Sequence, residues 1–187
     1  DIDDLRVDAL VKSKWSQGGE GGSPCYNYYT PSNCVCGCMA TAYCQVMRYH
    51  QWPTTGVAVV TYNLSVNGVS TPCTTRGGNG SGGPYDWANM TLDPDASITL
   101  AQRQAIGALT SDAGIFLWMG YTDGLSSSGF SAGPLIDNFH YANAVNSSNT
   151  HDYTAGGEFH KILNTNFDAG YPTMLAINGS GGGHGLA

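Results

Sequence analysis

Residues 37–53 read Gly-Cys-Met-Ala-Thr-Ala-Tyr-Cys-Gln-Val-Met-Arg-Tyr-His-Gln-Trp-Pro, and this segment predicts a helix over 38–50 that begins at a cysteine. The proline at 53 ends it, because the residue before a proline disfavours helical geometry. A helix N-terminus carries partial positive charge and unpaired N–H groups. Both features favour the thiolate of Cys38, which is the nucleophilic form. The segment therefore predicts a nucleophilic cysteine on the first turn of a helix.

The chain has five histidines, and His184 is the best candidate for a base that works with Cys38. It lies in the run 181–185, Gly-Gly-Gly-His-Gly, after a predicted buried strand over 172–177. The small neighbours allow another group to approach the imidazole closely. His50 is twelve residues after Cys38 in the same helix, so about 18 Å separates them. The others are expected on polar helix faces or in a polar loop: His140, His160 and His151. Cys38 and His184 together predict a nucleophilic enzyme.

Composition excludes several classes of function. The 187 residues suffice for one domain with a core, and 41% of them are apolar. Only 11% are charged, against about 25% in a typical domain. The net charge of −7 and the lack of a basic run argue against nucleic acid and anionic membranes as partners. No apolar run approaches the roughly 18 residues of a membrane span.

Low charge and 26 glycines are typical of a secreted bacterial protein. The first residues, Asp-Ile-Asp-Asp, carry no signal-peptide pattern, so we expect that a signal peptide and a pro-segment were removed.

Six cysteines lie at positions 25, 34, 36, 38, 44 and 73. If Cys38 is a free nucleophile, at least one other cysteine cannot pair within the chain. Cys44 is the expected odd one, buried as a small apolar group on the same helix. The remaining four could form one or two disulfides of undetermined connectivity, or all could be reduced.

The rest of the chain predicts a mixture of helices, strands and loops, with no internal repeat and no linker between domains. The best helix spans 97–113, with one apolar face and Gly114 as its stop. Helices are also expected over 132–142, with Leu135, Ile136 and Phe139 inward, and over 157–166, with Phe159, Ile162 and Leu163 inward. The other expected segments are a short helix or irregular arm at 5–15, loops at 16–37, 71–84 and 126–129, a strand or two over 57–64 that end before Asn67-Gly68, and a short strand at 116–121.

Several segments together resemble the streptopain family of bacterial cysteine proteases, to which interpain belongs. Residues 37–53 resemble the nucleophile helix of that family, and Gly182-Gly183-His184 resembles its catalytic histidine loop. Gln17, within Trp15-Ser16-Gln17-Gly18, is similar to the segment that carries the oxyanion glutamine. Two further stretches, 85–87 and 135–141, also match, so the similarity covers nearly all of the chain in order.

The resemblance implies an α+β, papain-like fold with the nucleophile at a helix N-terminus packed against an antiparallel sheet, in a single domain over 1–187. It implies a secreted, extracellular endopeptidase, made as a zymogen, that acts on proteins or peptides without a cofactor. Cys38 would be the nucleophile, His184 the base, and the Gln17 side chain with the Cys38 N–H the oxyanion hole. Ser127, Ser128, Gly129 and Gly183 would line a cleft that prefers a bulky apolar residue at P2, the second position before the cut.

The chain departs from the family pattern at several points. Cys34, Cys36 and Cys44 stand where small or apolar residues are usual, and Gly185 stands where alanine is usual. The chain ends at Ala187, and the family's Asn-Trp-Gly-Trp-like segment and last strands are absent. The expectation is a nicked or incompletely represented protein in which a second chain supplies the remainder.

Three other functions fit parts of the pattern. Cys34, Cys36 and Cys38 with His184 offer metal ligands, although this spacing matches zinc sites poorly. Eleven tyrosines and four tryptophans would suit a non-catalytic, disulfide-stapled binding module, such as an inactive protease homologue. The same Cys/His pair would also serve a transglutaminase or acyltransferase.

Overall fold

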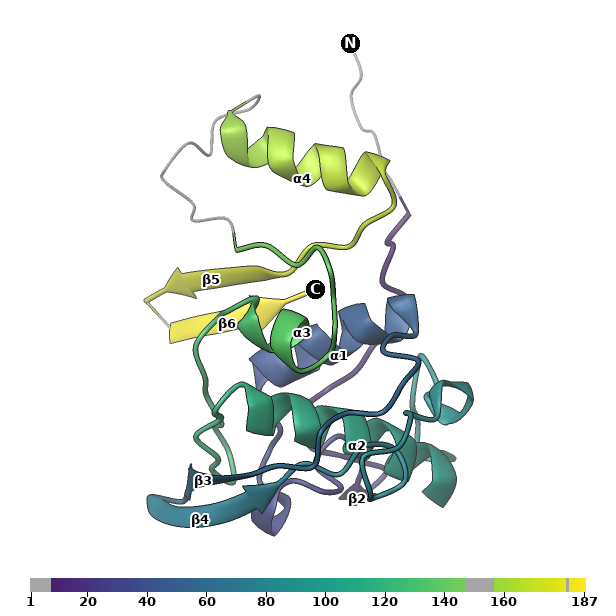
Figure 1. Cartoon of the computed structure of the whole chain (residues 1–187), viewed down its shortest axis with the longest axis vertical. Helices are drawn as coiled ribbons and strands as arrows, with labels where there is room; N and C mark the ends of the chain where they lie inside the picture. Colours follow the sequence, from purple (N-terminus) through teal and green to yellow (C-terminus); the bar gives the residue numbers. More distant parts are fainter. Residues whose placement is uncertain (1–7, 147–156, 181) are drawn as a thin grey trace.

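The computed structural model describes residues 8–146, 157–180 and 182–187 (Figure 1). Helices α1, Cys38–His50, and α2, Leu100–Phe116, pack against each other at its centre. The described residues also form three two-stranded antiparallel sheets. These pair β1 (Gly19–Glu20) with β2 (Ser23–Pro24), β3 (Thr61–Val66) with β4 (Val69–Thr74), and β5 (Leu175–Gly179) with β6 (Gly182–Leu186). The predicted α+β class is confirmed.

Helix α1 has the predicted bounds, and it ends where the backbone turns left-handed at Gln51, whose N–H donates to the Met47 carbonyl. Helix α2 begins three residues later than predicted and is capped by Thr99, which exchanges hydrogen bonds with Gln102 in a capping box. The expected stop at Gly114 is wrong, because α2 continues to Phe116. A Cβ at Gly114 would lie 2.2 Å from the Tyr121 hydroxyl, so this glycine admits a close neighbour.

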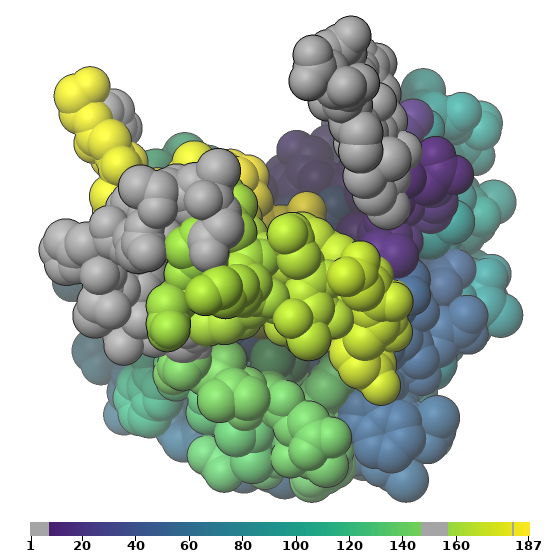
Figure 2. Space-filling view, turned by 90° about the horizontal axis from the view of Figure 1, so that it is seen from above, coloured from purple at the N-terminus to yellow at the C-terminus, as the bar shows by residue number. Residues whose placement is uncertain are grey.

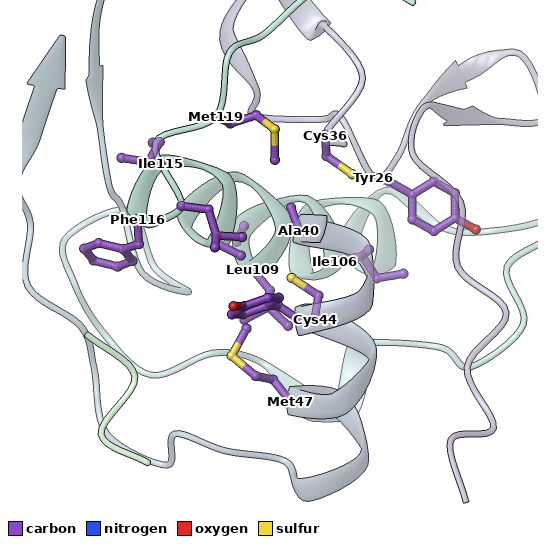
Figure 3. Close-up of a cluster of buried hydrophobic side chains, with 14 of the residues drawn as sticks. Tyr26, Cys36, Ala40, Cys44, Met47, Ile106, Leu109, Ile115, Phe116 and Met119 are labelled. Atoms are coloured by element: carbon purple, nitrogen blue, oxygen red, sulfur yellow. The ribbon is translucent and has the colours of Figure 1, made fainter. Parts of the chain in front are cut away.

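The core lies between α1 and α2 (Figure 3). Cys44 and Met47 of α1 face Ile106 and Leu109 of α2, and all four are completely buried. Removing a side chain such as Ile106 from water stabilises the fold by roughly 1.5–3 kcal/mol. The predicted burial of Cys44 is confirmed, and its thiol is free.

Strands β3 and β4 form a hairpin that the sequence predicted only in part. The strand expected over 57–64 is found at Thr61–Val66, and Asn67 and Gly68 after it adopt the positive φ that a tight two-residue hairpin requires. The predicted loop over 71–84 is wrong for its first residues, because β4 extends to Thr74. The predicted strand over 116–121 is also wrong. Only Gly120 and Tyr121 take part in isolated bridges, to Ser127 and Val66.

A buried carboxylate fastens the glycine-rich loop that follows β4. Asp112 of α2 accepts hydrogen bonds from the N–H groups of Arg76 and Gly77, both at 2.8 Å, and from the Tyr85 hydroxyl at 2.7 Å. Asp112 is fully buried, and this burial raises its pKa. The three donors satisfy the carboxylate and tie the loop to the core.

Shorter helices complete the fold: two 3-10 turns, Pro31–Asn33 and Trp87–Asn89, and helices α3, Gly133–Asp137, and α4, Glu158–Asp168. Helix α3 is much shorter than the predicted 132–142. Leu135 and Phe139 are buried as predicted, but Ile136 is 44% exposed, because the helix ends before its face is completed. Residues 8–18 form no helix. They comprise the described part of the expected N-terminal helix or arm and the start of the loop that follows it.

The last segments are more exposed than the sequence suggested. Helix α4 closely matches the prediction, and it stands out across the face seen in Figure 2. None of its residues is fully buried: Phe159 and Leu163 are half-buried and Ile162 is 43% exposed, so the inward packing expected of these three residues is only partial. Strand β5 is also largely exposed, contrary to the buried strand predicted over 172–177. His151 lies outside the described residues. No described helix has the length and apolar character needed to cross a bilayer.

Candidate active site

Cys38 is the first residue of α1, and Gly37 caps the helix with φ at 88°. Gly37 offers no side-chain acceptor, so the N–H groups of the first turn have no side-chain cap. Cys38 is partly buried, whereas the other five cysteines are buried. The sequence thus puts one accessible thiol at the positive end of a helix dipole.

Gly37 is required where the loop after α2 passes beside the start of α1. A Cβ there would lie 2.7 Å from the Met119 side chain and 3.1 Å from the Ser126 carbonyl oxygen. The positive φ would strain any other residue as well. The close approach brings the chain at Met119 and Ser126 against the turn that carries Cys38.

Strand β6 packs against helix α1 (Figure 1). The Gly185 N–H donates a hydrogen bond to Cys38 Sγ at 3.4 Å. Gly185 is buried against Met39, whereas His184 is exposed. Among the described residues, His184 makes no hydrogen bond to Cys38. The structure therefore brings the strand of the predicted base to the predicted nucleophile, with the backbone of the next residue making the contact.

Gln17 lies at the same end of α1. Its carbonyl accepts a hydrogen bond of 2.9 Å from the Cys36 N–H, two residues before Cys38. The preceding carbonyl, of Ser16, accepts one of 3.1 Å from the Thr41 hydroxyl on α1. Gln17 is half-buried. Three segments, around residues 17, 126 and 185, thus converge on the first turn of α1.

The predicted substrate residues occupy two sides of this region. Ser127 is exposed and pairs with Gly120 through two backbone hydrogen bonds, whereas the Ser128 hydroxyl is buried and has no hydrogen-bond partner among the described residues. Gly183 is exposed on β6. Gly129 lines a hollow that neither Cys38 nor His184 borders. Its other lining residues are Phe116, Leu117, Trp118, Phe130, Ser131, Gly133, Pro134, Asp137 and Asn138.

All six cysteines are free, so the alternative of one or two disulfides, and with it a disulfide-stapled module, finds no support. Burial raises the pKa of Cys25 to about 11 and that of Cys36 to about 12. Cys34 donates to Asp123 at 3.3 Å, and Cys36 contacts Thr41. Over the described ranges, no group of three or more His, Cys, Asp or Glu side chains is arranged to hold a metal ion.

The sequence did not single out Thr41, Met119 or Gly185 as site residues, although each touches the nucleophile turn or its neighbours. Thr41 is three residues after Cys38, about one turn further along α1, so the two lie on the same side of the helix. This spacing was the signal in the sequence that could have identified Thr41 as a neighbour of the nucleophile. Met119 and the contact of Gly185 depend on tertiary packing that periodicity does not encode.

The chain resembles known proteins over nearly its whole length. Streptopain from Streptococcus pyogenes is 28% identical over 202 residues, which cover 95% of this chain and 48% of streptopain, so the chain spans about half the length of the curated relatives it matches. The structure of active wild-type interpain A cysteine protease from Prevotella intermedia superimposes with a TM-score of 0.75 at 24% identity, over 96% of this chain and 74% of that one. A prointerpain A fragment from the same organism gives 0.74, again at 24% identity and over 96% of this chain, but over 56% of that one.

These superpositions confirm the papain-like fold predicted from the sequence. The model of the Peptidase C10 family matches residues 15–186, and that range contains the Gln17 segment, the nucleophile helix and the histidine strand. The chain belongs to the Peptidase C10 family.

Proposed function

We propose that the protein is a secreted bacterial cysteine endopeptidase with Cys38 as nucleophile and His184 as general base and acid. The observation that carries the proposal is the hydrogen bond from the Gly185 N–H to Cys38 Sγ. His184 directly precedes Gly185, so this bond holds the backbone of His184 close to the sulfur. Hydrogen bonds between catalytic groups are often long in the absence of substrate and tighten when it binds. His184 is exposed, so its side chain can change rotamer without disturbing buried packing.

The proposed reaction has two stages. Cys38 Sγ attacks the carbonyl carbon of the scissile peptide bond, and its proton passes to His184. The tetrahedral intermediate collapses as the C–N bond breaks, and the His184 imidazolium gives its proton to the departing amine. Water, deprotonated by His184, then attacks the thioester. This second attack releases the acid and restores the Cys38 thiol.

The oxyanion formed in each stage is proposed to bind the Cys38 N–H and the side-chain amide of Gln17. The N–H belongs to the uncapped first turn of α1. Gln17 is held nearby through its own carbonyl, which accepts from the Cys36 N–H. Donors fixed in advance are effective because they do not reorganise as the charge develops.

Peptide substrates are proposed to lie between the 127–129 segment and Gly183. Gly129 borders the hollow that also contains Phe130 and Trp118, and these apolar side chains support a preference for a bulky apolar P2 residue. A removed pro-segment and an extracellular location are part of the proposal, and they rest on family membership and the low charge of the chain.

The decisive experiment compares the protein with its Cys38→Ala and His184→Ala variants on an unfolded protein substrate. Turnover by the parent, lost in both variants, supports the endopeptidase. Transfer of the acyl group to an added amine in preference to water would instead identify an acyltransferase. A parent that binds the substrate but never cleaves it would reject the proposal and favour a non-catalytic homologue.

A further inference from the structure

Thr41 joins the two parts of the proposed oxyanion hole through one hydroxyl group. The residue is buried on α1, and its Oγ1 lies 3.1 Å from the Gly37 carbonyl and 3.1 Å from the Ser16 carbonyl. Gly37 precedes the Cys38 N–H, and Ser16 precedes Gln17. A single side chain thus contacts the residue before each proposed donor.

The hydrogens at this hydroxyl can be assigned from the chemistry of its neighbours. A carbonyl oxygen only accepts, so the one Thr41 proton is shared between Ser16 and Gly37 in a three-centre bond. The Cys36 sulfur lies 3.3 Å from Oγ1 and 3.8 Å from the Gly37 carbonyl oxygen, so its S–H has both as acceptors within reach. This agrees with the complete burial of Cys36, which raises its pKa to about 12 and keeps the thiol protonated.

Cys36 provides a second tie between the same segments. Its N–H donates to the Gln17 carbonyl at 2.9 Å, while its sulfur contacts the Thr41 hydroxyl. Figure 3 shows Cys36 beside the first turn of α1. Hydrogen bonds to two successive carbonyls therefore hold the backbone of Ser16 and Gln17 in place. They fix the position of the Gln17 Cα, from which its side chain extends.

We propose that Thr41 is a positioning residue of the oxyanion hole, which holds the Gln17 segment in register with the Cys38 N–H through its shared hydroxyl. The inference rests on the proposed function, since it assigns Thr41 to the same site. Thr41 does not touch the substrate; it acts by fixing the distance between two donors. Serine should replace it and valine should not, because valine keeps the shape but lacks the hydroxyl.

The test measures two reactions of Cys38 that differ in their need for an oxyanion hole. Peptide hydrolysis builds negative charge on a carbonyl oxygen, whereas alkylation by iodoacetamide displaces iodide at a saturated carbon and builds none. We expect Thr41→Val to lower kcat/KM for a peptide about tenfold, as displaced donors do. Thr41→Ser should stay within about twofold of the parent, and Cys38 alkylation should change by less than about twofold in both variants.

Combining the Thr41 and Gln17 substitutions tests whether Gln17 is the group that Thr41 positions. In a Gln17→Ala background, Thr41→Val should cause almost no further loss of kcat/KM, because the group that it positions is gone. Thr75→Val is the matched control: Thr75 is equally buried, and its hydroxyl donates to the Ala58 carbonyl at 2.7 Å, away from the site. It should lose thermal stability like Thr41→Val but retain parental kcat/KM. If Thr41→Val does not fold, Thr41→Ala carries the same predictions.

Several outcomes would overturn the inference. These are parental kcat/KM in Thr41→Val, an equal loss of alkylation, or full additivity with Gln17→Ala. If the parent is active and any of these results is obtained, the role of Thr41 is rejected but the proposed function is not. Absence of turnover in both the parent and Thr75→Val would reject the proposed function together with this inference.

Discussion

The backbone N–H of Gly185 donates a hydrogen bond to the sulfur of Cys38, and little space for a side chain remains between their two elements. The N···S distance is 3.4 Å. A Cβ at Gly185 would lie 2.3 Å from Met39 Sδ and 3.3 Å from Met39 Cα. The Met39 sulfur can swing aside, but its Cα belongs to α1. A methyl group is thus near the limit at this position, and a branched side chain exceeds it.

The Gly185→Val variant should therefore separate β6 from α1 and lower kcat/KM for peptide hydrolysis about a hundredfold, the size of effect expected from a displacement of about 1 Å. The control is Gly179→Val on the same hairpin, where a Cβ meets no atom within 4 Å. It should remain close to the parent. Equal activity of the two variants would show that the close approach of β6 is unimportant for catalysis.

Asp112 should be among the most sensitive positions of the fold. Asp112→Ala leaves two backbone N–H groups and the Tyr85 hydroxyl without their acceptor, and each unsatisfied buried group costs about 1–3 kcal/mol. We expect the free energy of unfolding to fall by about 3 kcal/mol or more, measured by urea denaturation. Asp112→Asn keeps one acceptor oxygen for the Arg76 N–H, and its NH2 group can donate to Tyr85 but leaves the Gly77 N–H without an acceptor, so it should lose part of this amount. Similar losses in both variants would contradict this account of the loop.

The sequence predicted the parts of the site that depend on local patterns. Helix α1 was predicted with its exact bounds, since both its apolar spacing and its termination are encoded within 37–53. The end of β3 before Asn67-Gly68 was equally local. Gly114 was expected to end its helix, but α2 continues past it. A glycine is needed there because the Tyr121 side chain packs against it, and this contact is not a local pattern.

Contacts between distant segments were beyond the sequence. Asp112 binds a loop 27 to 36 residues earlier, and no periodicity relates the two. Burial was also misjudged: α4 has a clear apolar face, yet none of its residues is buried, because amphipathic spacing predicts a buried face without identifying what covers it.

The hollow next to Gly129 predicts a change in substrate preference rather than in catalysis. Phe130 lines it and is 40% exposed, so truncation would remove apolar surface from the proposed P2 site. For Phe130→Ala we expect KM to rise about tenfold for peptides with a bulky apolar P2 residue and to change little for alanine at P2. Leu125→Ala is the control, because Leu125 is 80% exposed and does not line the hollow. A uniform rise in KM across the peptides would place the P2 site elsewhere.

Buried thiols should make the protein sensitive to alkaline pH. Burial raises the pKa of Cys25 to about 11 and that of Cys36 to about 12, whereas an exposed thiol titrates near 8.5. Above about pH 8.5 the unfolded chain loses these protons first, so the native state binds more protons and the free energy of unfolding falls as pH rises. The contribution is fully present below about pH 8.5 and is lost as pH approaches the folded-state values. Each thiol adds a slope of up to about 1.4 kcal/mol per pH unit.

Urea unfolding between pH 8 and 10, under reducing conditions, would measure this slope before tyrosines titrate in the unfolded chain near pH 10. Cys25→Ala should give a shallower decline, because one of the groups that releases a proton on unfolding is gone. Ser111→Ala, at an equally buried hydroxyl that does not titrate in this range, should lower stability by the same amount at every pH. A parental slope in Cys25→Ala would mean that this thiol keeps an ordinary pKa in the folded protein. The alkaline sensitivity would then have to arise from the other buried thiols.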